Sequence, residues 1–259
     1  MTAVFDVLGG LGRGAIALLG LLGRFGKFSA VLAVWLATSR PYVGETIRQC
    51  ARVGLHSAGI ICLILFFIGA NVALVGHTIF RQFGGQNMIG IYVGLSCVIG
   101  LAPLIVGAML GAKPGTEIAA TIASMRVKEQ IDALEVMAVN PFWYLIVPRM
   151  LAYLLVTPPL VVFAILASCA GGYFAGVYQL HNNPGTFLAD LVRFLTVADL
   201  WKGMIRAEVF AVVTCLVSCF YGYYSAPGPA GVSRAINLAV VVSSTSIIVI
   251  NYFLTEMMY

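Results

Sequence analysis

Long stretches without a charged residue recur along this chain and constrain its fold more than any other feature. An α-helix needs about 20 consecutive apolar residues to cross the hydrocarbon core of a bilayer. Each of the five stretches meets that length, and together they run almost to the end of the chain: Val53–Phe80, Gln82–Ala112, Met150–Ala189, Val209–Ser233 and Ala235–Thr255. The pattern predicts an all-α integral membrane protein with five transmembrane helices, folded as one domain over residues 1–259.

The third stretch is long enough to hold two short helices. Pro158-Pro159 would kink a helix there, and Gly171-Gly172 would break one. We prefer one long, kinked span, which gives five spans in all, with six as the alternative.

The first forty residues follow a different pattern, because charged residues interrupt the apolar ones. At about 100° per residue, the spacings between these charges return to nearly the same side of a helix. The charged residues are Asp6, Arg13, Arg24 and Lys27. We expect residues 1–40 to form a helix in the membrane interface rather than a cleavable signal peptide, and Ser39-Arg40-Pro41 to end it. A true first span is the alternative.

Basic residues are unevenly distributed among the segments that connect the stretches. Lys and Arg gather on the cytoplasmic side of membrane proteins. Only Arg81 lies between the first and second stretches, whereas two other segments are rich in basic residues: the one before the first stretch, with Arg13, Arg24, Lys27, Arg40, Arg48 and Arg52, and the one between the second and third, with Lys113, Arg126, Lys128 and Arg149. We therefore expect the N-terminus and residues 113–149 in the cytoplasm and the C-terminus outside, although Arg193, Lys202 and Arg206 are exceptions to the rule.

Composition argues against several classes of function. Charged residues make up 10% of the chain, against about 25% in soluble domains. The net charge of +5 does not indicate a nucleic-acid partner, because the 15 basic residues form no single patch. The three histidines and six cysteines lack metal-ligand spacing, so we expect no metal site and interpret the cysteines as small apolar residues. Small-residue stripes are expected to allow close helix packing: Gly107, Gly111 and Gly115, and Gly172 and Gly176.

Residues 116–149 form the densest cluster of charges in the chain. Four apolar residues in this segment are spaced as one face of an α-helix, and charged residues cover the rest. The apolar face is Val127, Ile131, Leu134 and Ala138, and the charged residues are Arg126, Lys128, Glu129, Asp132 and Glu135. Asn140-Pro141 is expected to end this helix. An ordinary interfacial loop helix would show the same pattern, but a coupling helix, which docks into a groove on a cytoplasmic ATPase, is the functional interpretation.

Several motifs resemble the MlaE/YrbE permease family. The longest is SMRVKEQIDALEVMAVNP, residues 124–141, followed by LIVPR at residues 145–149. Phe67-Ile68-Gly69 in the first span is similar to a family F-I-G. Near the end of the chain, three further motifs are similar to family patterns: Tyr221-Gly222-Tyr223, Gly231-Val232-Ser233-Arg234 and Asn251-Tyr252-Phe253-Leu254-Thr255. The resemblance covers almost the whole chain.

The resemblance implies a permease subunit of an ABC transporter that moves lipid, in the best-known branch phospholipid. It implies five spans after an interfacial helix, with the coupling helix region at residues 116–140 between the second and third. It also implies a cytoplasmic ABC ATPase that binds ATP and magnesium, an MCE-domain lipid-binding protein on the far side, and a second permease copy, identical or related. The chain itself would be non-catalytic, hold no cofactor and cross the bacterial cell membrane, the inner membrane in a Gram-negative cell.

Three departures from the family pattern lie in and after the second span. Where the family commonly shows R-E-L-G-P, this chain has Ile99-Gly100-Leu101-Ala102-Pro103; the G-R-A-G and A-E-[IL]-G patterns are replaced at residues 112–115 and 120–123.

In the family, a basic residue usually stands at the place of Arg206 in the fourth span. We expect Arg206 to face the bundle interior rather than to reach back to the headgroups, and Glu208, or an acid on a partner chain, to balance its charge.

The resemblance places the lipid path between permease copies, open toward the outer leaflet. The outer halves of the first two spans offer apolar walls and a few polar groups. The candidate lining residues are Phe66, Asn71, Leu74, His77 and Tyr92, together with Arg206 and Glu208. Ordinary packing residues would show the same pattern. The alternative functions are a secondary transporter, for which the chain shows no repeat, and a membrane-embedded lipid-modifying enzyme, for which it shows no polar cluster.

Overall fold

The computed structural model describes residues 2–38, 42–82, 88–193 and 195–258, and within these ranges the side chains from residue 19 onward. The described residues are almost all helical and include no strand, which confirms the predicted all-α fold. Six helices are long and apolar enough to cross a membrane. The elements in chain order are α1 Thr2–Thr38, α2 Val43–Gln82, α3 Ile89–Leu95, η2 Ser96–Leu101, α4 Ala102–Leu110, η3 Gly111–Gly115, α5 Thr116–Val127, α6 Gln130–Val136, η4 Phe142–Ile146, α7 Val147–Tyr173, η5 Phe174–Gln179, α8 Pro184–Arg193, α9 Val197–Tyr223 and α10 Pro229–Met258.

The second span is longer than its uncharged stretch. It runs without a break from Ile89 to Val127, 39 residues, so the predicted end at Ala112 is wrong. At 1.5 Å per residue it is about 58 Å long, nearly twice the ~30 Å hydrocarbon core. A helix of this length extends beyond the core, so the charged residues that follow Ala112 do not mark its end.

The third stretch forms one continuous helix, Phe142–Gln179, which confirms the single-span interpretation. The helix passes through both the double proline and the double glycine. Its predicted end at Ala189 is wrong, because the chain turns at His181, whose φ is 55°, and then forms the short helix α8. The lack of charge up to Asp190 concealed this turn from the sequence pattern.

The last two spans begin at other residues than expected. Helix α9 begins at Val197, not Val209, because Thr196 and Asp199 form a capping box that satisfies free backbone N–H groups at its N-terminus. It ends at Tyr223, and α10 then begins at Pro229. As a result, Arg206 lies well inside α9 rather than near the boundary of a span.

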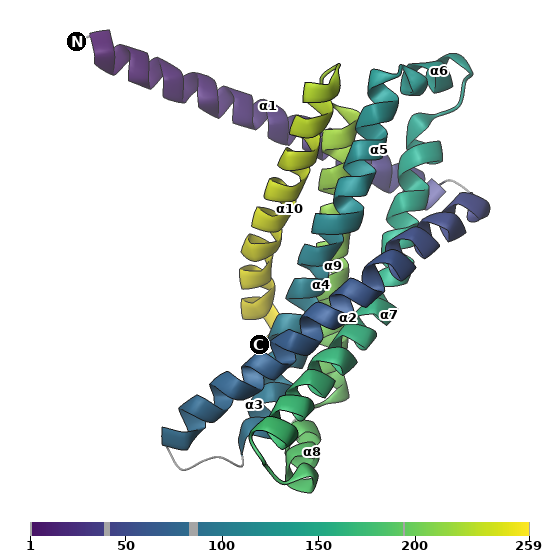
Figure 1. Ribbon diagram of the computed structural model, residues 1–259. Coiled ribbons are helices and arrows are strands. Elements are labelled where there is room, and N and C mark those ends of the chain that lie inside the picture. The colour runs from purple at the N-terminus through teal and green to yellow at the C-terminus, as the bar shows by residue number, and fades with distance from the viewer. Residues whose placement is uncertain (1, 39–41, 83–87, 194, 259) are drawn as a thin grey trace.

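Helix α1 runs obliquely across the end of the bundle where α6 lies (Figure 1). Phe28 and Leu32 anchor it, each 2% exposed, whereas Arg24 and Lys27 are exposed. Residues 19–38 are also long and apolar enough to span a membrane, so the interfacial placement stays a prediction. The side chains of Asp6 and Arg13, and the break expected at residues 39–41, lie outside the described residues.

Helices α2 and α7 form the most extensive contact of the bundle and lie side by side in Figure 1. A Cβ added at Gly69 would lie 1.8 Å from the Ser168 carbonyl oxygen, and one at Gly171 would lie 1.8 Å from that of Phe66. Only glycine allows backbones to approach this closely. The two predicted glycine stripes play the same role, because added Cβ atoms at Gly107 and Gly172 would clash with Phe210 and Val93.

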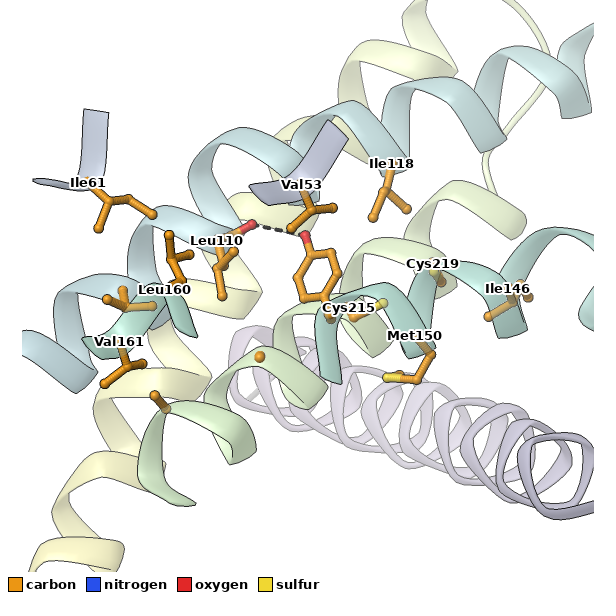
Figure 2. Packing of buried hydrophobic residues seen from close by; sticks show 14 of the residues in the cluster. Val53, Ile61, Leu110, Ile118, Ile146, Met150, Leu160, Val161, Cys215 and Cys219 are labelled. Atoms are coloured by element: carbon orange, nitrogen blue, oxygen red, sulfur yellow. Dashed lines mark hydrogen bonds between the residues drawn. The ribbon is translucent and has the colours of Figure 1, made fainter. Parts of the chain in front are cut away.

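The core lies between α2, α4, α7 and α9, as the buried residues in Figure 2 show. Cys97, Cys215 and Cys219 are fully buried and free, as expected for small apolar residues. A hydrogen bond crosses this core, because the Tyr153 hydroxyl donates to the Leu110 carbonyl over 3.1 Å (dashed in Figure 2). Pro114 follows Leu110 by four residues and has no N–H, so it leaves this carbonyl without its usual helical donor.

Candidate functional site

The charged segment after α5 folds as two helices joined by a turn, not as one amphipathic helix. Helix α5 ends at Val127, and Glu129 adopts a left-handed conformation with φ of 57° before α6 begins at Gln130. Helix α6 ends at Val136, earlier than the predicted stop at Asn140-Pro141. The prediction of one continuous helix through Ala138 is therefore wrong, because no glycine or proline announces the break at residues 128–129. We call residues 128–141 the α6 loop.

A left-handed residue closes α6 in the way that glycine usually does. Ala138 has φ of 59°; its N–H donates to the Glu135 carbonyl, and the N–H of Val139 donates to that of Leu134. This pair of bonds is the Schellman arrangement. Asn140 then begins the next helix, since its side-chain Oδ1 accepts a 2.9 Å hydrogen bond from the Phe142 N–H.

The apolar residues predicted to form one docking face are divided between the two sides of the α6 loop. Ile131 is fully buried in the main core, and Leu134 packs against that core. Val127 is half-buried beside the start of α10, and Ala138 is exposed. The expected acidic residues Glu129, Asp132 and Glu135 are all exposed. The face opposite the core is therefore the one that is open to a partner.

Two apolar residues that the sequence pattern did not single out project from the α6 loop. Val136 is 88% exposed and Met137 is 64% exposed. Ile131, which is buried, lies five residues before Val136 and six before Met137. Residues at these spacings lie on different sides of a helix, so Val136 and Met137 point away from the core. They could have been identified from the sequence as two adjacent apolar residues that do not belong to the apolar face already assigned to this helix.

The α6 loop is held to the bundle by charge and by aromatic rings. Arg126 Nη1 donates to Asp132 Oδ1 over 2.5 Å, and the Tyr223 hydroxyl donates to Glu135 Oε1 over 3.4 Å. The rings of Phe142 and Tyr223 lie 5.4 Å apart between centroids, and Phe28 of α1 contacts both. This cluster connects the loop with α1, η4 and the end of α9.

Arg206 lies in the interior of the bundle and is 2% exposed, so it does not reach back to the headgroups. Its Nη1 donates to the Ile99 carbonyl over 2.6 Å, and its Nη2 donates to Asn251 Oδ1 over 2.5 Å and to Thr255 Oγ1 over 2.9 Å. These groups come from η2 and α10, and Asn251 and Thr255 belong to the terminal motif noted above. Among the described residues, three neutral oxygens accept from a charge that would otherwise be costly in a membrane.

The Ile99 carbonyl is free to accept from Arg206 because of a proline. Pro103 is four residues farther along and has no N–H to donate to it. The helix widens at η2, Ser96–Leu101, next to this proline. Two prolines of the same span thus each remove the usual helical donor of one carbonyl. Pro103 does so for Ile99, which accepts from Arg206, and Pro114 does so for Leu110, which accepts from Tyr153.

Glu208 is not among the hydrogen-bond partners that the described residues provide to Arg206. Its Oε2 atom is buried and accepts no hydrogen bond from the described part of the chain. The expectation that Glu208 balances Arg206 therefore receives no support from the geometry. Arg149 is a second buried basic residue that the sequence pattern missed: it is 5% exposed, and its Nη1 has no partner among the described residues.

The five candidate lipid-path residues of α2 and α3 do not converge on one cavity. Phe66 packs against the ring of Phe174, and Tyr92 packs against Phe80. Asn71 and Leu74 lie on the open face of α2, and His77 is half-buried with no partner for Nδ1 among the described residues. Within one copy of the chain they form part of a surface, and the described residues hold no group of three metal-ligating side chains.

These features define a multi-pass α-helical membrane protein with an exposed helical loop at one end and a buried arginine surrounded by oxygen atoms within the bundle. The chain belongs to the MlaE permease family, because the family pattern described as Permease MlaE matches residues 46–257. This confirms the resemblance noted from its motifs.

Relatives cover nearly the full chain. A protein of Rickettsia felis named "Probable ABC transporter permease protein" is 35% identical over 256 residues, 99% of each chain. The "Intermembrane phospholipid transport system permease protein MlaE" of Haemophilus influenzae is 28% identical over 257 residues, 99% of this chain and 98% of its own. "Protein TRIGALACTOSYLDIACYLGLYCEROL 1, chloroplastic" of Arabidopsis thaliana is 26% identical over 252 residues, 91% of this chain and 71% of its own.

Proposed function

We propose that this chain is the non-catalytic membrane subunit of an ABC transporter that moves phospholipid between the membrane and an MCE-domain partner. A separate cytoplasmic ATPase binds ATP and magnesium and supplies the energy. Family membership supports the permease role, and the name of the Haemophilus influenzae relative supports phospholipid as the cargo. In this arrangement the α6 loop lies in the cytoplasm and α8 lies on the outer side.

The observation that carries the coupling role is the exposed pair Val136 and Met137 on a loop whose other side is buried. Apolar side chains this exposed are suited to a hydrophobic groove on a partner. Ile131 and the Arg126–Asp132 ion pair hold the loop to the bundle. Movement of the ATPase groove would therefore displace α5 and the aromatic cluster instead of only bending the loop.

We place the lipid path on the open face of α2, between this chain and a second permease copy. Phe67 is 64% exposed and Leu74 is 39% exposed, and Asn71 supplies a polar group on the same face. Arg206 anchors α9 to η2 and α10 in the half of the bundle away from the α6 loop. In this proposal Arg206 holds these three elements in register while lipid passes.

A docking experiment tests this function. Val136→Asp together with Met137→Asp would place two charges in an apolar groove, where burying each original side chain contributes roughly 1.5–3 kcal/mol. We expect the ATPase to be lost from the purified complex while the permease still inserts and elutes normally. The matched control is Leu188→Asp on α8 at the opposite end, where Leu188 is 49% exposed. Retention of the ATPase by the double variant, or its equal loss in the control, would contradict the coupling role.

A further inference from the structure

A cavity lies between α1, α9 and α10 at the end of the bundle that carries the α6 loop. It has a volume of about 250 Å³. Its lining comes from three elements far apart in sequence, among them Leu21 and Arg24 of α1, Tyr221 of α9, and Arg234 and Leu238 of α10. None of the described side chains that line it is acidic.

Two arginines give this cavity its chemistry. Arg24 and Arg234 are both exposed, and neither makes an ion pair or hydrogen bond with the described residues. Elsewhere at this end of the bundle, Arg48 pairs with Glu45 and Arg126 pairs with Asp132. Two guanidinium groups that share a cavity without a carboxylate are suited to a phosphate, which accepts charge-assisted hydrogen bonds from both.

A further polar group and the start of a helix lie at the same cavity. The Ser225 Oγ atom is buried and has no hydrogen-bond partner among the described residues, and Ser225 lines the cavity. Helix α10 begins close by at Pro229 with no acidic residue in its first turn. The partial positive charge of a helix N-terminus therefore adds to the two arginines.

Most of the remaining lining is apolar or aromatic. Leu21, Ala235 and Leu238 form one wall, and the packed rings of Phe220 and Tyr224, 5.1 Å apart between centroids, form another. An inorganic ion would gain nothing from these walls, whereas a molecule with a phosphate and acyl chains would use both parts of the site.

We propose that this cavity binds the phosphate headgroup of an anionic phospholipid in the leaflet on the α6-loop side, with an acyl chain along Leu21 and Leu238. It is distinct from the surface of α2 assigned above to lipid passage. Binding of this lipid joins α1 to the end of α9 and the start of α10. Lipid binding is measured on the permease alone, so its result does not depend on whether the chain takes part in ATP-driven transport.

The test uses the full-length chain in a neutral detergent with equal amounts of phosphatidylglycerol and phosphatidylcholine, and native mass spectrometry to count the retained lipid. We expect the wild type to retain phosphatidylglycerol preferentially. Arg24→Gln with Arg234→Gln should lower this preference about tenfold, and Arg24→Lys with Arg234→Lys should retain part of it. The control, Arg48→Gln with Arg81→Gln, removes the same charge from exposed arginines outside the cavity and should keep the preference.

Three outcomes would overturn the proposal. The cavity variant, eluting and melting like the wild type, could retain the full preference. The control could lose as much preference as the cavity variant, which would point to diffuse attraction. Inorganic phosphate, added at the concentration of the lipid, could displace bound phosphatidylglycerol, which would identify a site for a small anion instead of a lipid.

Discussion

Gly69→Ala should separate α2 from α7 and destabilise the bundle. The added Cβ would lie 1.8 Å from the Ser168 carbonyl oxygen and 2.7 Å from its carbonyl carbon, backbone atoms that cannot rotate away. Restoring even a tight 3.0 Å contact requires the two helices to move apart by about 1.2 Å. Overpacking of this kind typically costs about 1–3 kcal/mol, and the facing contact at Gly171 would loosen as well.

The substitution also removes a flexible glycine from a helix, which favours folding by roughly 0.5–1 kcal/mol. Because the clash is with backbone atoms, we expect overpacking to outweigh this gain. The net loss of stability should be about 2 kcal/mol, and the melting temperature should fall by roughly 4–8 °C for a chain of this size. Thermal unfolding of the purified protein in detergent measures this shift. Gly59→Ala is the matched control on the same helix, because no atom lies within 4 Å of its added Cβ. If the two variants melt at the same temperature, the close approach of α2 and α7 is not a determinant of stability.

Two further substitutions test the roles of proline and arginine. Tyr153→Phe removes the hydrogen bond that the Leu110 carbonyl accepts across the core and should cost about 1 kcal/mol. Pro114→Ala restores an N–H four residues on, so the double variant should recover part of that stability in thermal unfolding, and no recovery would refute the explanation. Arg206→Ala should impair lipid transport while the ATPase still co-purifies. Arg206→Lys should retain part of the activity, because lysine keeps the charge but lacks the planar fork whose two terminal nitrogens reach η2 and α10 at once. Normal transport by Arg206→Ala would remove Arg206 from the proposed mechanism.

The transmembrane character of the chain could be predicted from the sequence because bilayer thickness dictates the length of an apolar stretch. The ends of the helices could not. The charges that follow Ala112 were interpreted as the end of the second span, whereas its helix continues to Val127. At the start of α9 the capping box of Thr196 and Asp199 decides the boundary, a local signal that the charge pattern concealed.

Burial of Arg206 was predicted correctly, but its partners were not. Asn251 and Thr255 lie 45 and 49 residues away in sequence, and helix periodicity within one element cannot pair two distant elements. The single helix predicted for residues 127–138 does not form, for a local reason. Glu129 takes a left-handed conformation that its residue type does not announce, and this turn directs Ile131 into the core and leaves Val136 exposed.

ATP hydrolysis by a partner subunit is proposed to drive phospholipid movement through this chain. The most direct measurement reconstitutes the complex, co-purified from native membrane, in liposomes containing labelled phospholipid and follows transfer of the label to or from a soluble MCE-domain protein. We expect transfer that requires ATP hydrolysis and is lost in the Val136→Asp, Met137→Asp permease. Transfer at the same rate without ATP, or with the double variant, would contradict it.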